Sequence, residues 1–252
     1  EFFTLVVANT DSGFNLNQLL LGGLVFSLGL ILVVVAGAEL FTGNNLIVIA
    51  WAGGKLSLGQ VVRNWVVVYF GNLVGSLGTV MLMYLSGQWT FAGYRIGATA
   101  LNIANNKVNL SFTEGLVRGI LCNVLVCLAV WLCMSGRSVV DKIWAILFPI
   151  TAFVASGFEH SVANMYFIPM GLLLRGEPEV VAAAGKVAGD LVNLNLAGFV
   201  GNLISVTTGN IFGGGFLVAM VYWFIYRRQQ TDVRRALNLF PASQIVGEYK
   251  DE

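Results

Sequence analysis

The chain has 252 residues, of which 57% are hydrophobic and only 11% carry a charge, and its mean hydropathy is +0.78. An average soluble domain has about 25% charged residues, so this composition excludes a disordered chain and a disulfide-rich secreted scaffold, and it argues against a soluble enzyme. The net charge of +1 argues against nucleic acid as a partner. The composition therefore predicts an all-α protein that crosses a lipid bilayer several times.

Intervals without a charged residue mark the expected membrane helices. A span needs about 17–25 mostly apolar residues, and the uncharged intervals predict helices at 65–86, 116–134 and 192–226. The third interval is long enough to contain an irregular stretch. Two further apolar segments, 16–54 and 143–174, are too long for one helix, and each is interrupted by an acidic residue.

The interruptions are Glu39 in the first segment and Glu159, followed by His160, in the second, and glycines lie close to each. A carboxylate at mid-bilayer depth requires protein or water around it. Non-helical backbone is tolerated at that depth only where it is buried in protein or lines a cavity. We therefore expect two discontinuous helices, each made of two half-helices joined by an unwound turn near the midplane.

The apolar residues at the start of the chain, 2–8, are too few to span a membrane and lack the basic start of a signal peptide. They are expected to end a helix whose beginning is absent, which makes six spans in the intact protein. With both termini cytoplasmic, the inner loops and tail hold nine Lys and Arg residues and the outer loops five. This difference favours that orientation. Residues 227–252 are expected to form a cytoplasmic tail, with an amphipathic stretch at 233–240.

An internal repeat relates the two interrupted segments. Residues 37–44 and 157–164 share a glycine, a glutamate and an asparagine at an offset of 120. The helices that follow match as 71–74 against 201–204, at an offset of 130, which assigns ten extra residues to the polar loop 175–190. Internal similarity of this kind is typical of transporters that contain inverted repeats.

The repeat predicts a single transmembrane domain over residues 1–226. Its halves, about 1–90 and 112–226, each consist of a helix, a broken helix and a helix. An odd number of spans in each half forces the halves into opposite orientations. The expected fold is a six-helix bundle made of two inverted three-helix repeats with discontinuous second and fifth helices.

His160 is the only histidine and follows the acid of the second break. In a soluble core, such a residue would most simply bond to a neighbouring helix. An ionisable group at this depth in a membrane instead favours a pore role, in which a neutral imidazole donates a hydrogen bond or a proton to a small carboxylate. Thr42 of the first break has two equally supported roles. Its hydroxyl either faces the pore opposite His160 or bonds to the local backbone.

Glu39 and Glu159 occupy equivalent positions of the repeat. They could relay protons, but we favour a structural role in which each carboxylate accepts hydrogen bonds from backbone N–H groups freed by the break. Asn44 and Asn164 are interpreted as structural in the same way. We expect no metal and no cofactor, because the chain has no phosphate loop, dinucleotide fingerprint or zinc-protease motif.

The sequence resembles the formate/nitrite transporter family over essentially its whole length. The matching motifs lie at 37–42, 64–72, 135–138, 155–164, 168–171 and 202–211. This resemblance implies an aquaporin-like fold and a homopentamer with one pore in each protomer. It also implies a bacterial inner membrane as the location.

The resemblance further implies a role for individual side chains of the pore. His160 is similar to the central histidine of the family, and Thr42 to its partner. The cytoplasmic constriction is expected at Leu30, Leu40 and Phe41, and the periplasmic one at Phe26, Val126 and Phe153. Lys107 and Asn123 resemble polar residues that draw anions toward the outer side of the pore.

The resemblance and the residues together predict a channel for formate and similar small monovalent anions, in which His160 could protonate the substrate. A channel for nitrite or hydrosulfide and a proton-coupled formate symporter remain as alternatives of the same class. A membrane-embedded enzyme subunit with His160 and Glu159 as acid and base is disfavoured by the absence of a cofactor motif. A neutral-solute pore of the aquaporin type is disfavoured because paired Asn-Pro-Ala motifs are absent.

Overall fold

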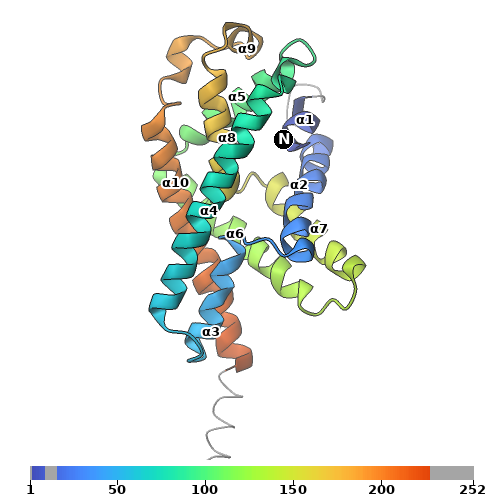
Figure 1. The fold of residues 1–252 in the computed structure, drawn as a ribbon, viewed down its shortest axis with the longest axis vertical. Coiled ribbons are helices and arrows are strands. Elements are labelled where there is room, and N and C mark those ends of the chain that lie inside the picture. Colours follow the sequence, from blue (N-terminus) through green and yellow to red (C-terminus); the bar gives the residue numbers. More distant parts are fainter. Residues whose placement is uncertain (1, 9–15, 228–252) are drawn as a thin grey trace, which may run out of the picture.

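The computed structural model describes residues 2–8 and 16–227 (Figure 1). These residues form helices joined by short turns, with no strand among them. In chain order the helices are α1 (Phe2–Ala8), α2 (Leu16–Ala36), η1 (Gly43–Ile47), α3 (Val48–Ala52), α4 (Leu58–Leu85), η2 (Gln88–Thr90), α5 (Arg95–Val108), α6 (Phe112–Cys133), α7 (Val139–Ala155), α8 (Ser161–Leu174), α9 (Pro178–Ala183), η3 (Ala188–Leu191), α10 (Leu196–Ile211), η4 (Phe212–Met220) and η5 (Trp223–Arg227). The predicted tail, including the stretch at 233–240, lies outside the described residues except for position 227.

Three helical segments are long and apolar enough to cross a membrane: Leu58–Leu85, Phe112–Cys133 and Leu196–Tyr226. They confirm the three uninterrupted spans that the charge gaps predict. The first two begin several residues earlier than predicted, and each starts with a capping box. Ser57 exchanges hydrogen bonds with Gln60, and Ser111 with Glu114. A search for uncharged intervals starts these spans too late, because a charged residue lies inside the beginning of each helix, Arg63 in α4 and Glu114 in α6.

The third span contains the irregular stretch that its length predicts. The α-helical turns of α10 end at Ile211 and continue as the π-helical segment η4. A Cβ atom at Gly213 would collide with the backbone of Ile120 on α6, and one at Gly214 would collide with the side chain of Asn123. The close approach of the two helices therefore requires glycine at these positions.

Both predicted helix breaks are present. Helix α2 is followed by a short non-helical turn and η1, and α7 is followed by a similar turn and α8. Each turn contains a glycine with positive φ, +79° at Gly37 and +66° at Gly157. Residues with a Cβ atom rarely adopt this conformation. The glycine that the two repeat motifs share is thus the residue that allows each helix to end.

Matching hydrogen bonds hold the two breaks. In the first break, Asn72 accepts a hydrogen bond from the N–H of Phe41 at 2.9 Å and donates one to the carbonyl of Glu39 at 3.0 Å. In the second break, Asn210 makes the same two bonds, also at 2.9 and 3.0 Å, to the positions that lie 120 residues further along the chain. The offset of 120 between the breaks therefore has a direct structural basis.

The same bonds correct the predicted register of the helices that follow. Asn72 corresponds to Asn210, at an offset of 138, so the predicted match of 71–74 with 201–204 at an offset of 130 is wrong. A second pair of contacts agrees with the corrected register. Asn44 donates to an asparagine 20 residues later, whereas Asn164 donates to one 38 residues later. The additional residues of the second half form α9 and η3, which the sequence did not predict.

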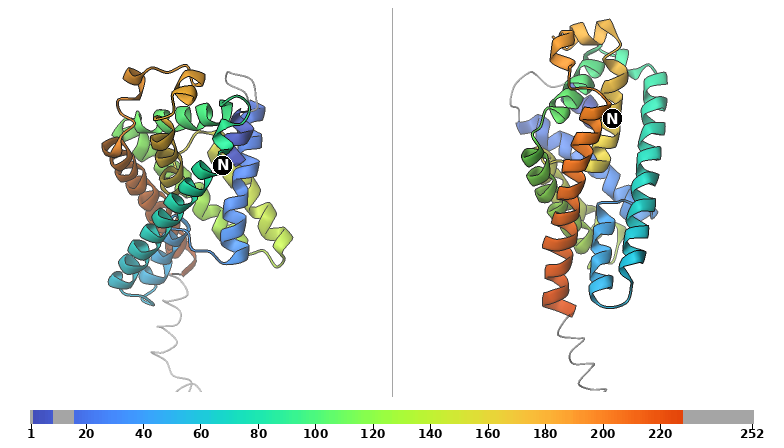
Figure 2. Two further views of the ribbon diagram at one scale, coloured as in Figure 1. Left: turned by 45° about the horizontal axis from the view of Figure 1, so that its top comes forward. Right: turned by 90° about the vertical axis from the view of Figure 1, so that its left-hand side faces the viewer.

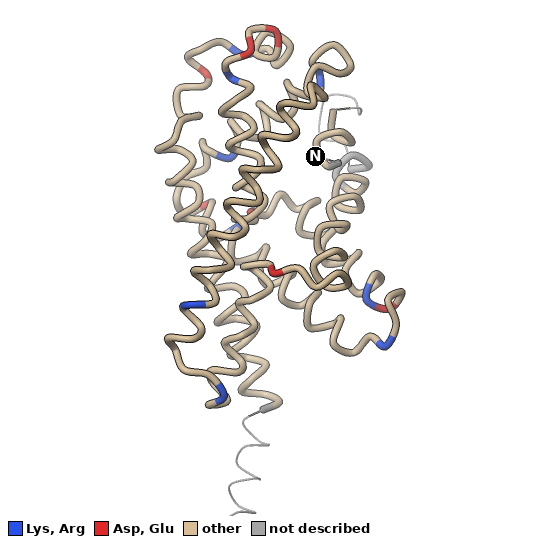
Figure 3. The backbone as a smooth tube through the Cα atoms, viewed as in Figure 1, with Lys and Arg blue, Asp and Glu red and all other residues tan. Residues whose placement is uncertain are grey.

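The helices form an elongated bundle (Figures 1 and 2). Helix α2 packs against α7, α6 packs against α10, and α8 contacts both α4 and α5. Helix α5 is a further element that the sequence did not predict, because Arg95 and Lys107 lie within it and interrupt the apolar pattern. Figure 3 shows that most charged positions lie at the ends of the bundle and in its loops, as expected for a protein surrounded by lipid.

Candidate functional site

His160 lies at the second break, where its side chain caps helix α8. The imidazole Nδ1 accepts a hydrogen bond from the backbone N–H of Ala163 at 3.1 Å. The Nε2 atom lies 2.9 Å from Oγ1 of Thr42, which belongs to the first break. Both residues are buried, with 7% of His160 and none of Thr42 exposed. The fold thus joins the two breaks through the side chains that the sequence predicts as partners.

The capping bond assigns the tautomer of His160. Because Nδ1 accepts the N–H of Ala163, the proton of the neutral ring lies on Nε2. The Nε2–H group then donates to the hydroxyl of Thr42. A second proton would have to enter at Nδ1, where it would displace the capping N–H. The geometry therefore favours a neutral imidazole that acts as a hydrogen-bond donor.

The glutamates of the two breaks bond to asparagine side chains. Glu39 accepts a hydrogen bond from Nδ2 of Asn44 at 2.5 Å, and Glu159 accepts one from Nδ2 of Asn164 at 2.7 Å. We predicted that these carboxylates would take up freed backbone N–H groups. The structure gives that role to the side-chain oxygens of the asparagines on α4 and α10. An amide side chain both accepts and donates, so it satisfies an N–H and a carbonyl group of one break together.

The two breaks differ in charge. Nζ of Lys107, near the end of α5, lies 2.9 Å from both carboxylate oxygens of Glu159. This ion pair is largely buried, with side-chain exposures of 15% for Lys107 and 7% for Glu159. Glu39 is exposed, and among the described residues it has no cationic partner. The second break therefore carries a compensated pair of charges where the first carries an unpaired carboxylate.

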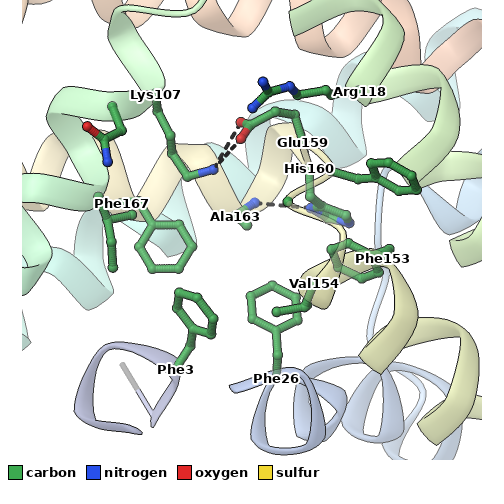
Figure 4. A pocket seen from close by; sticks show the side chains of 14 residues that line it. Phe3, Phe26, Lys107, Arg118, Phe153, Val154, Glu159, His160, Ala163 and Phe167 are labelled. Carbon is green, nitrogen blue, oxygen red and sulfur yellow. Dashed lines mark hydrogen bonds and ion pairs between the residues drawn. The ribbon is translucent and has the colours of Figure 1, made fainter. Parts of the chain in front are cut away.

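Two cavities meet at His160. One, which we call the polar cavity, has a volume of about 230 Å³ and is lined by three charged side chains and several aromatic rings (Figure 4). The other, which we call the apolar cavity, has a volume of about 180 Å³, and its lining is hydrophobic apart from His160 and a glycine. Phe26, Phe153, Ala163 and His160 line both. The Phe26 and Phe153 rings meet edge to face with their centroids 5.6 Å apart, so they form an aromatic constriction between the cavities.

Comparison with known proteins places this geometry in a family. The formate/nitrite transporter family matches residues 2–224. The chain is 48% identical over 234 residues to the formate channel FocA of Escherichia coli K12, covering 90% of this chain and 82% of that protein. It is 43% identical to the formate channel FocA of Haemophilus influenzae, covering 87% and 78%. The chain belongs to the formate/nitrite transporter family.

Solved structures agree with this membership. A structure described as a pentameric formate channel with formate bound superposes with a TM-score of 0.82 at 44% identity, covering 89% of each chain. A structure described as an FNT family ion channel gives a TM-score of 0.71 at 31% identity, covering 88% of this chain and 83% of that one. The fold and the sequence therefore support the same family.

Most side chains predicted for the pore of this formate/nitrite transporter line a cavity. Phe26 and Phe153 separate the two cavities, and Lys107 lines the polar one. Leu30, Leu40 and Val126 line the apolar cavity. Val126 was predicted on the same constriction as the two phenylalanines, and the structure places it on the apolar side of them.

Three predicted pore residues, Thr42, Phe41 and Asn123, lie outside the lining of both cavities, and Thr42 is connected to them through His160. The ring of Phe41 packs on α4, with its centroid 4.9 Å from that of Tyr69 and 6.4 Å from that of Trp65. Asn123 is fully buried, and its Nδ2 donates to the carbonyls of Thr42 and Asn210. All three residues therefore belong to the first break or contact its surroundings, and none of them lines a cavity.

The sequence reasoning also missed residues that shape the site. The asparagines at 64 and 72 and those at 202 and 210 recur at a spacing of eight in the two halves. This repeated spacing was the signal that could have identified them. Phe3 and Phe167 line the polar cavity with their centroids 5.9 Å apart, and Arg118 lines it as a third charged residue. No pattern in the sequence marks these three.

Proposed function

We propose that this chain forms a membrane channel for formate and similar small monovalent anions. The observation that carries the proposal is the bond between His160 and Thr42 at the junction of the two cavities, in a chain of this family. A small anion entering from the polar cavity passes the rings of Phe26 and Phe153 and reaches the imidazole. It then continues through the apolar cavity toward Leu30 and Leu40.

The constrictions exclude large and strongly hydrated solutes, because phenylalanine and leucine side chains offer no hydrogen bonds to replace water. An anion that has lost its hydration water needs a hydrogen-bond donor at the constriction. The Nε2–H group of His160 supplies one, since a carboxylate is a stronger acceptor than the Thr42 hydroxyl to which the group otherwise donates. One such hydrogen bond to a charged group stabilises the anion by about 1.5–3 kcal/mol. Thr42 acts as a positioning residue that holds the imidazole before the anion arrives.

The proposal makes His160 a neutral donor rather than a stored acid, because its Nδ1 is occupied by the N–H of Ala163. Proton-coupled formate symport is the second candidate. It would require this capping bond to break so that Nδ1 could take up a proton. Nitrite and hydrosulfide are alternative substrates, since each is a small monovalent anion that can accept the same hydrogen bond.

The assembly and its placement form part of the same proposal. The chain works as a homopentamer with one pore in each protomer, in a bacterial inner membrane, with both termini in the cytoplasm. Residues 1–226 form one transmembrane domain of two inverted three-helix repeats in an aquaporin-like arrangement. The matching bonds of Asn72 and Asn210 support the repeat. Residues 227–252 form the cytoplasmic tail, and the channel needs no cofactor or metal and has no enzymatic activity.

Flux measurements in proteoliposomes test the proposal. Formate, nitrite, chloride and glycerol are offered in turn to the wild type and to Thr42→Val and Thr42→Ser. We expect rapid formate flux in the wild type and in Thr42→Ser, and reduced flux in Thr42→Val, which has the same shape without the hydroxyl. Glycerol flux without anion flux would contradict an anion channel. Equal formate flux in Val and Ser variants would contradict the positioning role of Thr42.

A further inference from the structure

The polar cavity is lined by three charged side chains, namely Lys107, Arg118 and Glu159. Two of them compensate each other. Nζ of Lys107 lies 2.9 Å from each carboxylate oxygen of Glu159, and the pair is largely buried. At such a distance the two opposite charges largely cancel for an anion elsewhere in the cavity. The lining therefore has a net charge of +1, and that charge resides on Arg118.

Arg118 is poorly compensated by its own neighbour. Its guanidinium lies 3.6 Å from Glu114 one turn earlier on α6, and the two side chains are 42% and 51% exposed. Exposed pairs of this kind contribute little and are screened by salt. The other carboxylate oxygen of Glu114 is held by the N–H and hydroxyl of Ser111 in the capping box, and Glu114 does not line the cavity.

The placement of Arg118 on the cavity wall follows from the second break. The backbone N–H of Glu159 donates to the carbonyl of Arg118 at 3.3 Å, so the start of α8 is attached to α6 at this residue. Figure 4 shows the Arg118 side chain next to Glu159 at the side of the cavity away from Phe3 and Phe26. A half-exposed guanidinium in this position attracts anions while water remains around it, so it need not bind them tightly.

We infer that Arg118 supplies the net positive charge that concentrates small anions in the polar cavity, and that it sets the rate at which they enter. This inference rests on the proposed channel function. The family resemblance implies that Lys107 draws anions, but in this structure its ammonium group forms an ion pair with Glu159. Its main effect is to keep that buried carboxylate compensated.

The expected effect is moderate and depends on salt. One unit charge at about 8 Å in a water-like dielectric changes the local concentration of a monovalent anion by about two- to threefold. The Debye length is about 30 Å at 0.01 M ionic strength and about 3 Å at 1 M. The contribution of Arg118 to the entry rate should therefore be visible at low ionic strength and vanish at high ionic strength.

The experiment compares initial formate influx into proteoliposomes at about 0.01 M and about 1 M ionic strength. It uses the wild type, Arg118→Gln and Arg118→Lys, with Arg95→Gln as a matched control. Arg95 is an exposed cation at the start of α5, and it lines neither cavity. We expect a two- to threefold loss in Arg118→Gln at low ionic strength only, wild-type flux in Arg95→Gln, and recovery in Arg118→Lys, which retains the charge.

Each other outcome has a defined meaning. If the wild type conducts formate and Arg118→Gln matches it at low ionic strength, the role of Arg118 is refuted while the channel function stands. A loss in Arg118→Gln that persists at high ionic strength, or that Arg118→Lys does not restore, also refutes an electrostatic role. Absence of formate flux in the wild type refutes the channel function itself. Size-exclusion profiles of all variants verify that they assemble like the wild type.

Discussion

Substituting His160 by asparagine separates its two roles, because asparagine is a good helix N-cap but is too short to reach Thr42. The shorter side chain can still accept the N–H of Ala163, so α8 keeps its cap. His160→Ala removes both the cap and the donor. Loss of an N-cap costs about 1 kcal/mol, so the alanine variant should melt at a lower temperature than the asparagine variant.

The effect on flux follows from the lost donor. A hydrogen bond to a charged group is worth about 1.5–3 kcal/mol, and each 1.4 kcal/mol corresponds to about a tenfold change. If that bond stabilises formate at the narrowest part of the path, both His160→Asn and His160→Ala should conduct formate about 10- to 100-fold more slowly than the wild type. The two variants should then agree in flux and differ in stability.

The assay is stopped-flow formate flux into proteoliposomes between about pH 6 and about pH 8, the range in which an unperturbed imidazole titrates. A neutral donor predicts that the ratio of wild-type to His160→Asn flux stays constant across this range. Wild-type flux in His160→Asn would refute the donor role. A ratio that rises steeply as the pH falls would refute the neutral donor and favour protonation of the substrate by His160.

Three further predictions concern stability. Lys107→Met leaves Glu159 as an uncompensated buried charge, which costs about 3–5 kcal/mol. The yield of folded protein should therefore fall in Lys107→Met. It should recover in the double variant that also carries Glu159→Gln. An undiminished yield in Lys107→Met would contradict the stabilising role of the ion pair. Gly157→Ala places a Cβ at a φ of +66° and should lower the melting temperature through a strain of about 1–2 kcal/mol. Gly201→Ala, with open space around the new methyl group, should have little effect or be slightly stabilising, and similar melting of the two would count against the strain argument. Hydrogen bonds from the backbone N–H groups of the residues before α7 lower the pKa of Asp141 below its usual 3.8. Its stabilising contribution is therefore present above pH 3.8 and is lost as the pH falls further through the lowered value. The melting temperature of Asp141→Asn should therefore lack the part of the acid-induced decrease that Asp141 causes in the wild type. The same decrease in the wild type and in the variant would argue against this contribution of Asp141.

The membrane helices and their interruptions were largely readable from the sequence. Charged residues are excluded from lipid, so the intervals between them predict the membrane-spanning helices. An acidic residue close to glycine within an apolar segment predicts a helix break. The short elements α5 and α9 were missed because they contain charged residues and pack on the bundle instead of crossing it. Their helicity depends on contacts of α5 with α8 and α1 and of α5 and α9 with one another, which no local pattern reveals.

The register of the repeat shows where single-sequence reasoning fails. The pairs Gly71-Asn72 and Gly201-Asn202 look alike in sequence, but a dipeptide match cannot distinguish two asparagines that lie eight residues apart on the same helix. The structure decides between them, because only Asn210 lies close enough to bond to the backbone at Glu159 and Ser161.

The sequence by itself determined that the chain is a membrane protein of this family, where its helices break, and that its single histidine lies at a break. These properties follow from composition and from short motifs, in which each residue acts through its own chemistry. Only the tertiary structure decided which groups meet there. It joined Thr42 to His160, assigned the imidazole proton through Ala163 and paired Lys107 with Glu159. These contacts connect residues far apart in the chain, so they exist only once the helices have packed.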